Sequence, residues 1–204
     1  MAYSSSFTAG GILHNEFEAI LPFLLQPGIN EFLMQEAKDN IYLKIKTESA
    51  RKRVVTELKK RIEKVDIHFW ETYSASNEAE KKMLLFYLCC TTYQLVTDFH
   101  FKVTVAGYWT FTYEVDPFGY KMLLDELASK DETVHGWSDS TRKKCITNYV
   151  RMLKEAGLIS SNKIQKPILE NSFYCYFISQ QQTWALDIFL LNNLEKETII
   201  NYCR

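Results

Sequence analysis

Residues 138–159 read SDSTRKKCITNYVRMLKEAGLI, a pattern that predicts an amphipathic helix with a defined end. Ser138 or Ser140 can cap its N-terminus, because a serine hydroxyl accepts a hydrogen bond from a free amide of the first turn. Gly157 predicts a Schellman-type end, since glycine adopts the left-handed conformation that this motif requires. Apolar residues recur at three- and four-residue steps and predict the buried stripe: Ile146, Tyr149, Val150 and Leu153.

The opposite face of this helix carries hydrogen-bond donors. Five basic residues and no acidic ones lie between positions 140 and 154. Such side chains suit phosphates and base edges, so we predict a nucleic-acid interface here. Its residues are Ser140, Thr141, Arg142, Lys143, Lys144, Asn148, Arg151 and Lys154, and we expect Arg142, Lys144 and Arg151 to dominate. The alternative is an ordinary solvated helix face.

A second basic segment covers residues 44–64, where nine basic residues outnumber three acidic ones. Most of it lies in a predicted helix over residues 48–65. The pairs Arg53–Glu57, Glu57–Arg61 and Lys59–Glu63 are spaced to neutralise part of its charge. We expect four residues to extend the footprint: Arg51, Lys52, Lys59 and Lys60. The chain has a net charge of -1, so the remainder is strongly acidic, a distribution typical of one-sided phosphate binding.

The elements around the first basic helix follow the order of a winged helix-turn-helix. Asp116, followed by proline, predicts a capped helix over residues 117–128. A turn leads to the basic helix, residues 140–156. A short strand, a turn and a second strand follow, with Lys163 and Lys166.

The rest of the chain predicts more helices, and the fold class is mostly α. Residues 101–115 favour a strand by their β-branched and aromatic content, but Ala-Gly interrupts them, and we interpret them as a connector at a domain boundary. The architecture predicted is two packed helical bundles, residues 1–105 and 106–204, the second holding the winged unit and a few short strands. Helices are also predicted over residues 12–25, in a short segment that begins after a cap at Asn30, and over residues 77–100, where Asn77 and Glu80 form a capping box. A strand is predicted at residues 173–178, and one or two helices at residues 183–203.

The sequence carries no recognisable catalytic motif. There is no phosphate-binding glycine loop, and the four histidines lack the spacing of metal ligands. Glu114, Asp116 and Lys121 imitate scattered nuclease residues, but the strand context for that motif is missing. The five cysteines form no CxxC pair, so we expect reduced core thiols, with Cys145 on the apolar side of its helix. We predict a non-enzymatic protein without metal or cofactor.

Nothing in the sequence predicts a membrane protein. The most apolar run, residues 83–96, is too short to cross a bilayer, and the N-terminus lacks the pattern of a signal peptide. We therefore expect a soluble, cytoplasmic protein.

Three segments are distinctive: FTAGGIL (residues 7–13), SARKRVVTELKKRI (49–62) and the WSDSTRKK and LKEAGLI parts of 137–159. They resemble the BrxA family of BREX (bacteriophage exclusion) phage-defence systems. The resemblance covers about residues 7–169. It implies a mostly helical fold, similar in part to the antitermination factor NusB, with nucleic-acid binding and a role beside other defence proteins. It supplies no catalytic residues.

These observations leave three functions open. The first is a non-catalytic double-stranded DNA-binding component of a BREX system. The second is an RNA-binding factor of the NusB kind. The third is a protein–protein adaptor whose basic segments dock on acidic partners.

Overall fold

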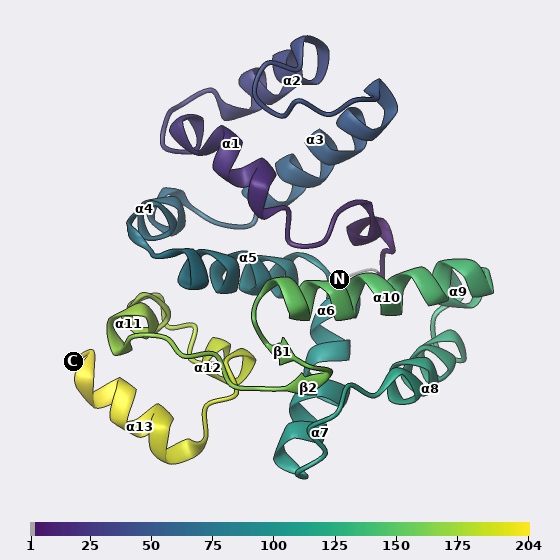
Figure 1. The fold of residues 1–204 in the computed structure, drawn as a ribbon, viewed down its shortest axis with the longest axis vertical. Helices are drawn as coiled ribbons and strands as arrows, with labels where there is room; N and C mark the ends of the chain where they lie inside the picture. The colour runs from purple at the N-terminus through teal and green to yellow at the C-terminus, as the bar shows by residue number, and fades with distance from the viewer. Residues whose placement is uncertain (1–2) are drawn as a thin grey trace.

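Helices carry almost the whole fold in the computed structural model, which describes residues 3–204 (Figure 1). The sheet found among these residues has two short antiparallel strands, β1 (Ile159–Ser160) and β2 (Lys163–Ile164). The predicted fold class, mostly α with a few short strands, is confirmed.

The first six elements form the upper part of Figure 1: η1 (Ser6–Ala9), α1 (His14–Leu24), α2 (Ile29–Asp39), α3 (Glu48–Ile62), α4 (Ile67–Ala75) and α5 (Glu78–Thr92). The predicted capping box of Asn77 and Glu80 is confirmed at the start of α5. The predicted cap at Asn30 is wrong. Because α2 already begins at Ile29, Asn30 lies inside its first turn and Gly28 is the N-cap.

The predicted helix over residues 77–100 breaks at Tyr93, whose backbone is extended. After it come α6 (Gln94–Phe99), the π-helical η2 (His100–Val105) and α7 (Ala106–Trp109). The segment interpreted as a connector, residues 101–115, is therefore helical as far as residue 109, despite its β propensity. Local β propensity gives way to burial, because this helical segment places Thr104 and Val105 in the core.

A chain of buried hydrogen bonds joins η2 to the helices around it. The carbonyl of Ile188 can only accept, so His100 donates to it from Nε2 at 3.0 Å. Burial keeps the ring neutral at pH 7, so its Nδ1 accepts from the Tyr149 hydroxyl, also at 3.0 Å. Thr104 Oγ1 lies 2.7 Å from the Tyr149 hydroxyl and 2.8 Å from that of Tyr120.

The neutral His100 predicts a loss of stability in acid. Burial lowers the pKa of His100 from 6.5 to about 4. The unfolded chain therefore binds the proton first, and the stabilisation present above pH 6.5 is lost as the pH falls towards 4. We expect this residue to account for about 3 kcal/mol of unfolding free energy between pH 7 and pH 4. Urea unfolding of the parent and of His100→Gln at both pH values measures it. Equal pH dependence in the two proteins would contradict it.

The second half continues with α8 (Pro117–Ala128), α9 (Glu132–His135), α10 (Asp139–Glu155), α11 (Asn171–Ser179), α12 (Ala185–Ile188) and α13 (Asn193–Tyr202). The strand predicted at residues 173–178 is wrong, because these residues belong to α11. Phe173, Tyr174 and Phe177 lie on one buried side of that helix, a helical rather than an alternating pattern. The prediction of one or two helices after residue 183 is confirmed.

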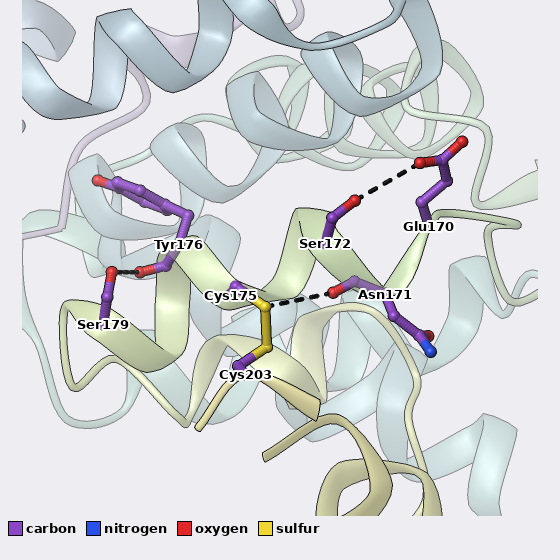
Figure 2. The surroundings of a disulfide bond; sticks show 7 residues. All are labelled: Glu170, Asn171, Ser172, Cys175, Tyr176, Ser179 and Cys203. Carbon is purple, nitrogen blue, oxygen red and sulfur yellow. Dashed lines mark hydrogen bonds between the residues drawn. A yellow bond between two sulfur atoms is a disulfide. The ribbon is translucent and has the colours of Figure 1, made fainter. Parts of the chain in front are cut away.

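A disulfide bond joins Cys175 of α11 to Cys203 just after α13 (Figure 2). The two Cα atoms are 5.2 Å apart. The expectation that all five cysteines are reduced is therefore wrong for this pair. Cys89, Cys90 and Cys145 are free and buried, as expected for core thiols. Burial raises the pKa of Cys145 to about 12, so this thiol is not a nucleophile at neutral pH.

The buried apolar side chains form one cluster that reaches from Phe17 of α1 to Ile199 of α13. The division into residues 1–105 and 106–204 stays a prediction. Among residues 3–204, no helix is both long enough and apolar enough to cross a membrane.

Candidate nucleic-acid interface

The basic helix α10 is fixed at both ends by the residues that the sequence indicated. The Ser138 hydroxyl accepts a hydrogen bond from the Thr141 amide, which selects Ser138 rather than Ser140 as the cap. At the other end Gly157 has φ +78°, and the amides of Gly157 and Leu158 donate to the carbonyls of Lys154 and Leu153. These are the two bonds of the Schellman motif, so the predicted helix end is confirmed.

The buried face of α10 consists of partly different residues from those that the sequence pattern indicated. Cys145, Tyr149, Met152 and Leu153 are buried, whereas Ile146 and Val150 are half-buried. α10 packs against α8, α5 and η1. It is therefore held on three sides, and a single outward side remains.

That outward side is a continuous polar stripe, which we call the α10 face. It consists of six exposed residues: Ser140, Lys143, Lys144, Thr147, Arg151 and Lys154. At 100° per residue they fall within an arc of about 100° on the helix. Within residues 3–204, Lys143, Lys144 and Lys154 form no ion pair. Asn148 is half-buried at its edge and donates to the Lys144 carbonyl.

Arg142 does not belong to the α10 face. Its Nη1 lies 3.1 Å from Asp125 Oδ1 of α8, and its Nη2 donates to the Val134 carbonyl at the end of α9. Only 22% of its side chain is exposed. Its charge is therefore already paired, and its contacts hold α10 against α8 and α9. The dominant role expected of Arg142 in binding stays a prediction.

Arg151 is exposed but paired. Its Nε lies 3.1 Å from Glu155 Oε1, and the other Glu155 oxygen accepts a hydrogen bond from the Ile12 amide at 2.9 Å. A Cβ on Gly11 would lie 2.3 Å from Glu155 Oε2 and 2.7 Å from Arg151 Nη2. Glycine at position 11 therefore lets the N-terminal segment approach the end of α10.

A short hairpin follows α10. Its turn residues, Ser161 and Asn162, both have positive φ, as in the type I′ turns that connect two-residue hairpins. A third segment pairs with β2, since Glu114 forms an antiparallel bridge with Lys163 and the Val115 amide donates to the Asn162 carbonyl. Residues 113–115 therefore lie along the edge of β2 opposite β1, joined by a single bridge rather than as a third strand.

The second basic segment is placed differently from the sequence-based expectation. Arg51 is buried and donates to the carbonyls of Ala37, Lys38 and Ile45, so it closes the end of α2. Lys52 is exposed and pairs with Glu48. None of the three i,i+4 pairs predicted for α3 is formed. Glu57 and Arg61 are buried in the core instead, where the Glu57 carboxylate accepts a hydrogen bond from the Tyr93 hydroxyl.

Lys59 and Lys60 are half-buried near the N-terminal segment. Lys60 donates to the Ser6 hydroxyl at 2.8 Å and lies 4.7 Å from the centre of the Tyr93 ring. The η1 turn that contains Ser6 packs against both α3 and α10. The two basic helices therefore meet on either side of one short segment, which their separation in sequence did not reveal.

Within the described residues, no group of three or more His, Cys, Asp or Glu side chains is placed to hold a metal ion. A cavity of about 670 Å³ lies between η2, α7 and α8, and no residue of the α10 face lines it. The α10 face is therefore the candidate functional site.

These features define a class: a mostly α-helical protein in which a capped basic helix precedes a short hairpin. The chain belongs to the BrxA family, whose model matches residues 1–181. It is similar to a protein of Bacillus cereus (strain H3081.97) named BREX protein BrxA, with 25% identity over 176 residues that cover 82% of this chain and 86% of that protein.

A solved structure shares the fold. The crystal structure of an uncharacterized protein from Magnetospirillum magneticum matches with a TM-score of 0.78 and 18% identity, over 94% of this chain and 100% of that chain. At this identity the similarity concerns the fold alone.

Proposed function

We propose that this chain is a non-catalytic, cytoplasmic component of a BREX phage-defence system that binds double-stranded DNA and works beside other BREX proteins. Membership of the BrxA family and the name of the Bacillus cereus relative support the defence role. The observation that carries the proposal of DNA binding is the α10 face, whose three lysines have no ion-pair partner among residues 3–204.

The topology supports a winged helix-turn-helix. In that fold a strand precedes the second helix and pairs with the last strand of the hairpin after the third helix. Residues 113–115, α8, α10, β1 and β2 follow this order, with the short α9 in the turn. α10 then takes the place of the helix that enters the major groove, and Lys163 lies on the wing.

From their contacts we assign the predicted site residues two roles. Lys143, Lys144 and Lys154 are free to meet phosphates, with Ser140, Thr141 and Asn148 close enough to extend the contact. Arg151 can contact a phosphate once its ion pair with Glu155 opens. Lys52, Lys59 and Lys60 can extend the DNA-binding surface across η1. Arg142 and Arg51 hold α10 and α2 in place.

The triple variant Lys143→Ala, Lys144→Ala, Lys154→Ala is expected to weaken binding to all duplexes alike. Each lost phosphate contact removes counterion release, so a plot of log affinity against log salt should flatten by up to about three units. Because the side chains are exposed, the unfolding free energy should change by less than about 1 kcal/mol. Fluorescence anisotropy on a random-sequence duplex at several salt concentrations measures both the affinity and the slope.

The matched control removes three exposed lysines outside both the α10 face and the second basic segment: Lys38→Ala, Lys121→Ala, Lys130→Ala. It should keep the parent slope to within one unit. An equal loss in both variants would mean that net charge alone drives binding. Competition with single-stranded RNA separates the NusB-like alternative, because a groove-docking helix requires B-form DNA. If the parent binds neither nucleic acid, the adaptor function replaces this proposal.

A further inference from the structure

The disulfide bond between Cys175 and Cys203 ties the C-terminal helix to a helix of the core (Figure 2). Cys175 lies in α11, whose Phe173 and Phe177 are buried, and Cys203 directly follows α13. Both cysteines are half-buried rather than enclosed, so a soluble reductant has access to the bond.

Apart from this bond, α13 is held by few buried contacts. Of its ten residues, all within the described part of the chain, only Ile199 is buried. A cavity of about 380 Å³ separates part of the helix from the segment that precedes α11. The ion pairs of Glu195 with Lys166 and of Lys196 with Asp187 are partly exposed, and pairs of that kind stabilise a fold little.

Once released, α13 is too short to persist as a helix. Asn192 and Glu195 form a capping box at its start, but isolated helices shorter than about 12–15 residues are marginal in water. The apolar core contains a single buried side chain from α13, so the remaining helices do not depend on it. The bond therefore controls whether a peripheral helix stays docked on a body that is folded in either case.

The cytoplasm exposes such a bond to reducing thiols. Disulfides are rare in cytosolic proteins, and those present are usually transient, catalytic or redox-sensing. Bonds that solvent can reach are also more often labile and regulatory than enclosed structural ones. In a cytoplasmic chain, an accessible bond that holds a weakly docked helix has the character of a regulatory bond rather than of a permanent staple.

We propose that the Cys175–Cys203 bond is a reversible redox switch, which a thioredoxin-class dithiol opens to release α13 from α11. One thiolate of the dithiol attacks a sulfur of the bond, so the S–S bond breaks and a mixed disulfide forms. The second thiolate of the dithiol then displaces the protein sulfur. The protein gains two electrons and two protons, and the dithiol becomes a disulfide. Glutathione disulfide closes the switch again by the same exchange, leaving two molecules of glutathione.

This switch presupposes the proposed cytoplasmic location, which supplies the reductant, but it does not require DNA binding. Its test therefore uses the full chain without nucleic acid, and a failure to bind DNA leaves the result intact.

The first measurement is the redox state of the native chain after incubation with reduced thioredoxin. The reaction is stopped with acid, and the cysteines are alkylated in denaturant and counted by mass spectrometry. The count should rise from the three free cysteines to all five, and it should return to three when excess glutathione disulfide is added. A bond that opens only after the chain has been denatured is a structural staple, and that result would overturn the proposal.

Hydrogen–deuterium exchange of the oxidised and the reduced chain shows which part of the molecule responds. Exchange should accelerate by about 100-fold in α13 and by less than about 3-fold in α3 and α5, because the tether restricts only the helix that it holds. Unchanged exchange in α13 would mean that the helix stays docked without the bond. Equal acceleration in all helices would mean that the bond supports the whole fold. Either result would contradict the switch.

Cys203→Ser and Cys175→Ser are the matched variants, since each removes the same bond without a reductant. In both, α13 should exchange as fast as in the reduced parent, and thioredoxin should change nothing further. If α13 instead exchanges at the rate of the oxidised parent, the bond does not hold the helix and the proposal is wrong. Neither cysteine is fully buried, so both variants are expected to fold. If one does not, the reduced parent alone decides between the outcomes.

Discussion

Arg61→Ala is expected to lower the free energy of unfolding by about 3–5 kcal/mol, the range for breaking a buried charged network by removing one partner. Arg61 lies on α3 but has no exposed surface. Its Nε donates to the Tyr93 hydroxyl at 3.1 Å and its Nη2 to the Gly11 carbonyl at 3.0 Å. Tyr93 in turn donates to the buried carboxylate of Glu57. Removing the guanidinium leaves that carboxylate in the core without its compensating charge.

Arg53→Ala is the matched control for this prediction, since Arg53 is an exposed arginine on the same helix. Its removal should change the unfolding free energy by no more than about 0.5 kcal/mol. Urea unfolding followed by circular dichroism at 222 nm compares the two variants with the parent. If Arg61→Ala and Arg53→Ala cost the same, the charge of Arg61 is not buried in solution.

Reduction of the disulfide is expected to lower the unfolding free energy by about 3.5 kcal/mol. The bond joins two cysteines that are 28 positions apart in the sequence, and a loop of that length restricts the unfolded chain by about this amount. It also ties α13, whose exposed side chains include Leu194 and Tyr202, to the core helix α11. Unfolding of the parent with and without dithiothreitol gives the difference.

Cys203→Ser provides the control, because reductant should then leave its unfolding free energy unchanged. Alkylation of the unreduced, denatured parent followed by mass spectrometry should label three cysteines: Cys89, Cys90 and Cys145. Labelling of all five would show that the bond does not form. Cys145→Ala is a different case, since that thiol is buried in α10 and its loss leaves a cavity.

Sequence patterns predicted the elements whose causes are local. The caps Asn77, Asp116 and Ser138 and the end at Gly157 were found because each depends on residues within one helical turn. The same holds for the hairpin after α10. Family membership was also predictable, since the segments at 7–13, 49–62 and 137–159 carry it, and the BrxA family match spans all three.

Local patterns failed where long-range burial outweighs propensity. Residues 101–109 are rich in β-branched and aromatic types, yet they are helical because η2 completes the core beside α8, α10 and α12. The strand predicted for residues 173–178 of α11 was wrong for the same reason. In both cases an apolar segment is compatible with strand and helix alike, and the neighbours that bury it decide.

The candidate site shows the same division between local and distant causes. The sequence by itself determined that α10 is a capped basic helix with one solvent-exposed face, because charge and periodicity are properties of consecutive residues. Only the tertiary structure decided which cations are free. Arg142 is engaged by Asp125 and Arg51 by the end of α2, whereas Lys143, Lys144 and Lys154 stay exposed. The disulfide belongs to the second group as well. A pairing depends on where distant segments lie, and no spacing along the chain encodes that position.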